Sequence, residues 1–431
     1  MKNVLVLGAY GLIGSACVAA LKRENFRVTG IGRSSEAARR SGLQIEWIIE
    51  DITDISVESW RHHLAEIDIV INAAGALQDG AGDQLSAIHD TAIAKLCEAA
   101  AGKELTLVQI SAAGVSETAP TEFFRSKARG DGHVQASDLD WVILRPSLVI
   151  GRNAYGGTAL LRGAAGFPGV GVRVFEGSPV QTIGLNELAD AVVACASGNM
   201  PMRQVFDLTE PDTRSFPETV SLVRDWLGFR PFLFHVRVPG IFLKLIGLMA
   251  DGLGWLGWRS PLRATALRTI ADGITASPEN WRLAGGSDFQ SLSNILASMP
   301  ATLQERWFAR LYLLLPLSIG LLSIFWLVSG FIGLWQFDRA VEVMTERGFD
   351  IRAGQLTVIS GSVADILLGT LVLYRPWAKR ACLGMMMLAI GYMVGATVFA
   401  PDLWGDPLGP MVKVLPSIGL AFSTFAMLEE R

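Results

Sequence analysis

Apolar runs of strand length alternate with segments of helical periodicity through the first half of the chain. A short apolar run bounded by glycine or polar residues is typical of a buried strand, whereas apolar positions that recur every three or four residues are typical of a helix. Strands and helices in alternation favour an α/β fold with a doubly wound parallel sheet. The predicted strands are 4–7, 27–34, 45–54, 67–76, 105–114 and 140–151, and the predicted helices include 84–101 and 121–136.

The last third of the chain has a different pattern, in which long apolar segments follow one another. Residues 311–335 carry no charge over 25 positions, which is long enough to cross a bilayer. The four segments are 311–335, 355–374 (interrupted by Asp365), 381–400 and 408–428 (with Lys413 near its start). They predict an all-α bundle of four transmembrane helices, with a lipid bilayer as its partner.

Loop charges predict the orientation of this bundle. Positively charged residues concentrate in the cytoplasmic loops of membrane proteins. They precede the first segment and fill the turn between the second and third, at Arg306, Arg310, Arg375, Lys379 and Arg380. We therefore expect a multi-pass membrane protein whose N-terminal domain and C-terminal end both face the cytoplasm.

A glycine-rich turn follows the first predicted strand. Gly8, Gly11 and Gly14 recur at intervals of three before a helical pattern begins. Because glycine has no Cβ, such a turn lets backbone N–H groups and the positive end of a helix approach a pyrophosphate. The strand–turn–helix context predicts a dinucleotide site at Gly8, Ala9, Tyr10, Gly11, Leu12, Ile13 and Gly14, against the alternative of a turn that binds nothing.

With this Gly-x-x-Gly-x-x-Gly spacing, the N-terminal region resembles the short-chain dehydrogenase/reductases of the extended or atypical branch, which have a Rossmann fold and bind a nicotinamide dinucleotide. The resemblance implies that Asp51 and Ile52 flank the adenine and that Asn72-Ala73-Ala74-Gly75 lies beside the cofactor. Arg33 ends the second predicted strand, where an arginine can pair with a 2′-phosphate. We therefore expect NADP(H) in preference to NAD(H), with NAD(H) left open.

The catalytic residues of this family are only partly present. The family uses a tyrosine four residues before a lysine, so that both lie on one helical face and the lysine lowers the pKa of the phenol. Ser111 and Lys127 are present, but Phe123 stands at the position of the tyrosine and has no proton to donate. Ser111 and Lys127 are therefore candidate catalytic residues, and Lys127 is also a candidate ligand of the nicotinamide ribose. Conventional turnover is not expected unless Tyr155 or a water supplies the proton.

The C-terminal third resembles the DoxX-like family of four-helix membrane domains. The resemblance rests on Asp365, on the segment 398–410 and on Lys413. An aspartate inside a bilayer is a functional candidate by default, and joining helices by hydrogen bonds is an equal alternative. Its expected partner is Lys413 or a tryptophan N–H. A reductase-like fold fused to a DoxX-like tail is a bacterial arrangement, which implies the bacterial inner membrane. The predicted domains are 1–230, 231–304 and 305–431.

The region 231–304 is expected to form a small substrate-type lobe and a linker. Its segment 240–258 is apolar but contains Lys244 and Asp251, which favours an interfacial helix with Trp255 and Trp258 at the level of the headgroups. A lobe that opens toward lipid would suit a hydrophobic substrate such as a quinone or an isoprenoid.

Cysteines, histidines and overall charge argue against other chemistries. The four cysteines are scattered without a Cys-x-x-Cys pair, which fits a reduced environment and no metal site. The histidines are expected to be surface or capping residues: His62, His63, His89, His133 and His235. The chain has 37 Lys and Arg against 41 Asp and Glu and no basic patch, so nucleic acid is not an expected partner.

Three functions remain open on these grounds. The first is a membrane-tethered module that holds NADP(H) without turnover, as in the similar accessory subunit of respiratory complex I that keeps a bound NADPH. The second is an NADPH-dependent reductase of a lipophilic substrate with another proton donor. The third is a non-catalytic assembly or scaffold protein, whose protein partners the sequence does not identify.

Overall fold

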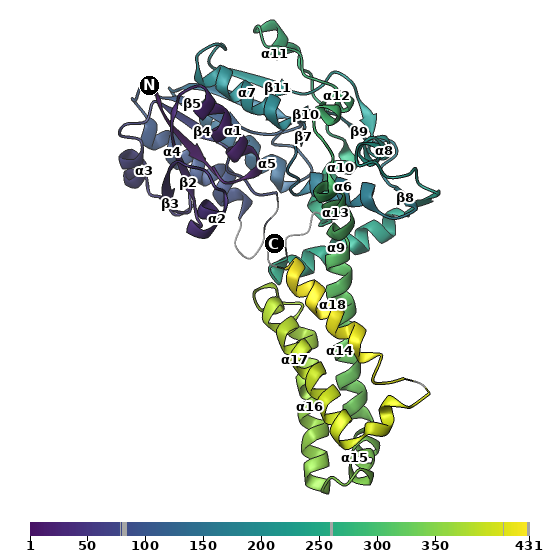
Figure 1. Cartoon of the computed structure of the whole chain (residues 1–431). Helices are drawn as coiled ribbons and strands as arrows, with labels where there is room; N and C mark the ends of the chain where they lie inside the picture. Colours follow the sequence, from purple (N-terminus) through teal and green to yellow (C-terminus); the bar gives the residue numbers. More distant parts are fainter. Residues whose placement is uncertain (78, 80–83, 259–261, 408, 429–431) are drawn as a thin grey trace. The chain divides into compact units, whose positions relative to one another are not determined.

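A seven-stranded sheet forms the centre of the N-terminal unit (Figure 1). All its strand pairs are parallel, and the strand order is β11-β6-β5-β4-β1-β2-β3. The winding direction reverses between β1 and β4, which is where open α/β sheets bind their ligands. The strands are β1 (Asn3–Leu7), β2 (Arg27–Gly32), β3 (Glu46–Ile49), β4 (Ile69–Asn72), β5 (Thr106–Ile110), β6 (Asp140–Pro146) and β11 (Gln204–Leu208). The doubly wound parallel sheet predicted from the sequence is confirmed.

The computed structural model describes residues 1–77, 79, 84–258, 262–407 and 409–428. It contains two compact units: Met1–Asp251 with Ser260–Ala309, and Gly252–Arg259 with Arg310–Arg431. The domain boundaries expected from the sequence, after residues 230 and 304, stay a prediction.

Helices cover both faces of the sheet. Because successive side chains of a strand point to opposite faces, each strand contributes to two cores. Val4 and Val6 of β1 belong to a core that includes side chains of α1 and α7. Leu5 and Leu7 belong to a second core with side chains of α3 and α4. The helices of this region are α1 (Leu12–Arg23), α2 (Ser35–Arg40), α3 (Val57–His63), the π-helical turn η1 (Ala87–Thr91), α4 (Ala92–Ala100), α5 (Glu122–Gln135) and α7 (Leu185–Ala196).

A smaller lobe with its own core completes the N-terminal unit. Three pairs of short strands contribute to it: β7 (Leu148–Ile150) with β10 (Thr182–Gly184), β8 (Val170–Arg173) with β13 (Phe234–Arg237), and β9 (Pro179–Val180) with β12 (Arg214–Ser215). Its helices are α6 (Gly157–Gly166), α8 (Phe216–Trp226), α9 (Gly240–Trp255), α10 (Ala264–Asp272), α11 (Glu279–Leu283), α12 (Leu292–Ala297) and α13 (Leu303–Tyr312). The core contains Leu161 of α6, Val220 of α8 and Leu296 of α12, which are all fully or almost fully buried.

The C-terminal unit is a bundle of apolar helices (Figure 1). Its elements are α14 (Leu314–Trp335), α15 (Phe337–Glu346), α16 (Ile351–Leu371), α17 (Arg375–Phe399), the 3₁₀ turn η2 (Pro401–Trp404) and α18 (Val414–Met427). Within the described residues, three helices are long and apolar enough to cross a membrane: Leu303–Trp335, which is α13 and α14 taken together, Ile351–Leu371 and Arg375–Phe399. The fourth predicted span is shorter than expected, because the helical part of 408–428 has only 14 residues.

Polar contacts identify the two ends of this bundle. Arg347, which precedes α16, forms a two-pronged ion pair with Asp402 after α17, at 2.8 and 3.1 Å. Arg375, which follows α16, donates to the carbonyl of Leu428 at 3.1 Å. These contacts lie at opposite ends of α16, so the chain from Asp402 to Leu428 runs from one end of the bundle to the other although α18 is short.

The segment 336–354 between the first two predicted spans contains the helix α15. The expected partners of Asp365 are wrong. Asp365 is 4% exposed, and its described partners are Ser329 (2.7 Å) and Tyr392 (2.9 Å) in place of Lys413 or a tryptophan. The carboxylate therefore joins α16 to α14 and α17.

Candidate nucleotide-binding site

The glycine turn between β1 and α1 has the geometry of a pyrophosphate-binding turn. Gly8 has φ of +69°, and a Cβ there would lie 2.9 Å from Cα of Ala74. A Cβ at Gly14 would clash with the carbonyl oxygen of Gly8, so α1 starts in direct contact with the turn. The N-cap of α1 is Gly11, which offers no side-chain cap, and the first turn has no acidic residue. The N-terminal N–H groups of α1 are therefore suited to an anionic ligand.

The predicted adenosine-binding residues follow β2 and β3, with Arg33 directly after β2 and with Asp51 and Ile52 after β3. Tyr10 packs over Gly32, where any Cβ would clash with its ring, and stacks on Trp47 with ring centroids 6.0 Å apart. Arg33 follows directly, is partly exposed, and lies 3.7 Å from the carboxylate of Asp51. The side chain of Ile52, in contrast, is buried in the hydrophobic core.

A loop that is hydrogen-bonded to Asn72 follows β4 on the other side of the turn. Asn72 is buried, donates to Gln109 at 2.7 Å and accepts the backbone N–H of Ala74 at 3.1 Å. The side-chain oxygen of Asn72 thus holds the loop backbone at Ala74, while its amide nitrogen is fixed by the side chain of Gln109 on β5. This loop touches the glycine turn through Ala73 and Ala74. The structure therefore brings two of the predicted segments together.

Ser111 is held by a buried carboxylate. Its hydroxyl donates to Asp131 Oδ2 at 2.8 Å, and Arg145 donates to the same oxygen at 3.0 Å. Asp131 is 1% exposed, and burial raises its pKa although Arg145 and Ser111 act in the opposite direction. Sequence reasoning did not identify Asp131, although its position four residues after Lys127 places it on the same side of α5.

Lys127 is buried on α5 and points toward the loop after β4. Its ammonium donates to the carbonyl of Ile110 at 3.1 Å, and a Cβ at Gly75 would lie 3.9 Å from Nζ. Burial lowers the pKa of Lys127 to about 8, while the nearby Asp131 carboxylate opposes this shift. Phe123 lies one turn earlier, with its ring centroid 5.8 Å from Nζ. The spacing of the family's tyrosine and lysine is thus retained, with a phenyl ring at the tyrosine position.

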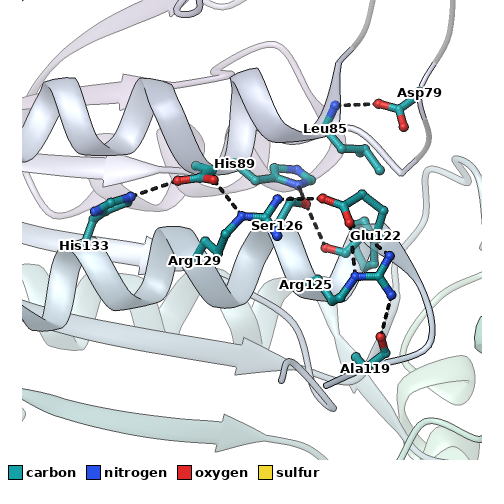
Figure 2. A network of polar contacts seen from close by, with 11 residues as sticks. Asp79, Leu85, His89, Ala119, Glu122, Arg125, Ser126, Arg129 and His133 are labelled. Atoms are coloured by element: carbon teal, nitrogen blue, oxygen red, sulfur yellow. Dashed lines mark hydrogen bonds and ion pairs between the residues drawn. The ribbon is translucent and has the colours of Figure 1, made fainter. Parts of the chain in front are cut away.

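His89 is a second residue of this site, besides Asp131, that sequence reasoning missed. It is 3% exposed, so the expectation of a surface or capping residue is wrong. Its Nε2 accepts the N–H of Ala76 at 3.2 Å, so the proton lies on Nδ1, which bonds to Ser126 at 3.0 Å (Figure 2). Desolvation and the Lys127 charge lower the pKa of His89 to about 2, so the ring is neutral. It also packs edge-on against Phe123. The signal that could have identified His89 was its position in the segment that packs against α5, the helix that carries Lys127.

An ion-pair network holds α5 beside the π-helical turn η1 (Figure 2). Arg129 pairs with Asp90 at 2.7 Å and with Glu122 at 2.6 Å, and His133 bonds to Asp90 at 2.8 Å. Gly130 allows α5 to approach the backbone carbonyl of His89 closely. This network keeps His89 beside Phe123 and Lys127. Within the described residues, no group of three or more His, Cys, Asp or Glu could hold a metal ion.

Comparisons with known proteins agree with this geometry. Residues 8–173 match the family model described as NAD(P)H-binding, and residues 323–422 match the DoxX-like family. The chain joins an NAD(P)-binding domain to a DoxX-like domain. An epimerase family protein of Staphylococcus epidermidis is 34% identical over 77 residues, which are 18% of this chain. The chain spans 23% of the length of that relative.

Solved structures share the fold of the N-terminal unit. The Bordetella bronchiseptica enzyme WbmH in complex with NAD+ aligns with a TM-score of 0.53 at 16% identity, covering 69% of this chain and 96% of that chain. The dTDP-glucose 4,6-dehydratase of Bacillus anthracis in complex with NAD aligns with a TM-score of 0.52 at 13% identity, covering 69% and 95%. At these identities the likeness concerns the fold alone.

Proposed function

We propose that this chain is a membrane-anchored NAD(P)-binding protein of the atypical short-chain dehydrogenase/reductase type that holds NADP(H) without conventional Tyr-x-x-x-Lys turnover. The observation that carries this proposal is the surroundings of Lys127. The ammonium is surrounded by Phe123, neutral His89 and the loop after β4. The phenyl ring of Phe123 occupies the helical position at which the family has its phenolic proton donor. Lys127 and the glycine turn retain the groups that bind a dinucleotide, while the group that would protonate a substrate is missing.

The preference for NADP(H) is supported by the position of Arg33. Arg33 directly follows β2, and its guanidinium lies 3.7 Å from the carboxylate of Asp51. A 2′-phosphate there would gain a charge-assisted bond to a planar donor. The carboxylate of Asp51 also accepts hydrogen bonds from the N–H and the hydroxyl of Thr53, at 3.1 and 2.9 Å, which hold it in place beside Arg33.

The test is nucleotide binding by the full chain in detergent or nanodiscs. We expect wild-type protein to bind NADPH more tightly than NADH, and Arg33→Ala to lose roughly tenfold in NADPH affinity, about 1.4 kcal/mol, with little change for NADH. The matched control is Arg27→Ala, which removes an exposed arginine at the start of the same strand. Absence of binding to either nucleotide would contradict the proposal and favour the scaffold alternative. An equal loss in both variants would contradict the role of Arg33.

A second function, reduction of a lipophilic carbonyl compound such as a quinone, is favoured by the buried Ser111 and Lys127. In such a reaction, hydride passes from NADPH to the substrate and a proton must come from another donor. NADPH consumption with a soluble quinone by the wild-type chain would support this second function over simple storage. The variant Phe123→Tyr restores a phenol next to Lys127 and is expected to raise any such consumption.

The location that fits this function is the bacterial inner membrane, with the nucleotide-binding domain in the cytoplasm. Arg375, Lys379 and Arg380 at the start of α17 support this orientation, because they lie at one end of the bundle. NADP(H) is also a soluble intracellular cofactor, which a domain on the cytoplasmic side can reach.

A further inference from the structure

The part of helix α9 that belongs to the N-terminal unit, residues 240–251, carries an exposed apolar face. Ile241, Phe242, Leu245, Leu248 and Met249 are each between 51 and 71% exposed. The other four residues lie one, four, seven and eight positions after Ile241, so all five are on one side of the helix. The opposite side is packed, since Gly247 contacts Ala264 of α10 and Ala250 is buried.

Such a continuous stripe is unusual on a surface that faces water. Single exposed apolar residues are common, whereas a contiguous patch of large side chains marks a contact with another apolar phase. The exposed apolar residues begin before the helix, with Leu233 and Phe234. Lys244 is the charged side chain among the exposed positions of this face, and its long stem allows the ammonium to reach a polar layer.

The chain itself indicates what covers this face. The residues that follow, 252–258, belong to the membrane unit. There Trp258 donates its indole N–H to the carbonyl of Leu373 at 2.6 Å, and the N–H of Arg375 donates to the carbonyl of Leu256 at 3.0 Å. The end of α9 is thereby fixed to the end of the bundle where Arg375 and Arg380 lie. A helix of 16 residues is about 24 Å long, so the chain keeps the apolar residues of α9 within about that length of Leu256.

We propose that α9 lies in the membrane interface, with the face formed by Ile241, Phe242, Leu245, Leu248 and Met249 in contact with lipid. This contact goes beyond nucleotide binding and does not depend on it. Of the two tryptophans expected at the level of the headgroups, Trp258 donates its indole N–H within the bundle and is partly buried there, whereas Trp255 is 71% exposed at the end of α9. The docking partner is an acyl-chain and headgroup boundary, for which this pattern of apolar face and lysine is suited.

The test places an environment-sensitive fluorophore on this face in the full chain. Leu248→Cys and, separately, Met249→Cys are labelled with a maleimide dye and reconstituted into nanodiscs of phosphatidylcholine and phosphatidylglycerol, with or without doxyl-labelled lipid. The matched control is Leu283→Cys on α11, which is 79% exposed. The native cysteines are buried, so unsubstituted protein provides the labelling background.

We expect at least twofold stronger quenching by doxyl lipid at positions 248 and 249 than at position 283. Equal quenching at all three positions overturns the proposal. Blue-shifted emission at 248 without lipid quenching also overturns it, because the face would then be covered by protein, either a second copy or the bundle. Either result leaves NADPH affinity unaffected, so failure here is distinguishable from failure of the proposed function.

Discussion

At the scale of single residues, the nucleotide-binding site combines retained binding groups with an altered proton-donor position. Lys127 keeps its ammonium buried beside Gly75, while Phe123 and neutral His89 pack against each other next to it. A buried imidazole whose two nitrogens are both hydrogen-bonded has no free position for a second proton. His89 therefore acts as a positioning residue for the loop that begins at Ala76 and does not replace the missing phenol.

This state of His89 predicts a pH dependence of stability. The pKa of His89 is lowered from 6.5 to about 2, so between these values the unfolded chain binds a proton that the folded chain does not. Stability is lost as pH falls below about 6.5, and at pH 5 this single group accounts for about 2 kcal/mol. His89→Gln should reduce the drop in thermal midpoint between pH 7.5 and pH 5, measured on the full chain in detergent.

The control for this measurement is His62→Gln, which replaces an exposed histidine of α3 and should show the wild-type drop. The comparison uses the difference between two pH values, so a general loss of stability in either variant cancels. An unchanged acid-induced drop in His89→Gln would mean that His89 is not held neutral.

At the scale of elements, close helix packing explains the polar residues of the bundle. A Cβ at Gly330 of α14 would lie 2.5 Å from the carbonyl oxygen of Ser362 on α16, so the two backbones nearly touch. Small residues at such contacts allow van der Waals packing without a hydrophobic driving force. Asp365 lies at this contact and accepts hydrogen bonds from α14 and α17. Of the two roles expected for Asp365, this arrangement supports joining helices.

Removing this junction should weaken the bundle without affecting the nucleotide-binding site. Asp365→Ala is expected to lower stability by about 1 kcal/mol, because two hydrogen bonds between helices are lost. Asp365→Asn, which can keep a bond to each partner, should lose less. The measurement is unfolding of the full chain by increasing sodium dodecyl sulfate in mixed micelles.

Tyr392→Phe tests the contact between α16 and α17 separately, and Tyr374→Phe is its control because Tyr374 follows α16 and lies outside the hydrogen bonds of Asp365. If Asp365→Ala retained wild-type stability, or if both tyrosine variants behaved alike, the carboxylate would not be a junction between helices.

At the scale of the whole molecule, the ends of the bundle determine which loops share a side of the membrane. The Arg347–Asp402 ion pair joins the segment before α16 to the segment after α17. The bond from Arg375 to Leu428 joins the turn after α16 to the end of α18. Charge at the two ends of the bundle is asymmetric, since the start of α17 carries Arg375, Lys379 and Arg380 and residues 372–380 contain no acidic residue.

This asymmetry predicts the sidedness of the protein in bacterial cells. A cysteine at Glu342 of α15 should react with a membrane-impermeant maleimide in intact spheroplasts. Cysteines at Arg380 and at Leu283 should react only after permeabilisation, because both are expected on the cytoplasmic side. Labelling of Arg380→Cys from outside, or of all three positions alike, would contradict the proposed orientation.

Local patterns were sufficient to predict much of this protein. The strands at 4–7 and 105–114, the glycine turn and the apolar segments were predictable because periodicity and segment length depend on the residues of one element. For the same reason, the spacing of four residues was sufficient to predict that Phe123 and Lys127 lie on one face of a helix. The length of the last helix was not predicted correctly, because the helix formed by the 408–428 segment is shorter than the apolar segment itself.

Contacts between distant residues could be decided only by the folded chain. The pairing of Ser111 with Asp131, the burial of His89 against Phe123, and the bond from Tyr392 to Asp365 each join different elements. A hydrophobic or polar pattern shows that a side chain is buried but not which neighbour it meets, because helix packing and strand order set those distances. The chain's own order of residues thus specifies a dinucleotide-binding sheet and a membrane bundle, while the packing of α5 on η1 and of α16 on α14 and α17 specifies which polar groups are held together in them.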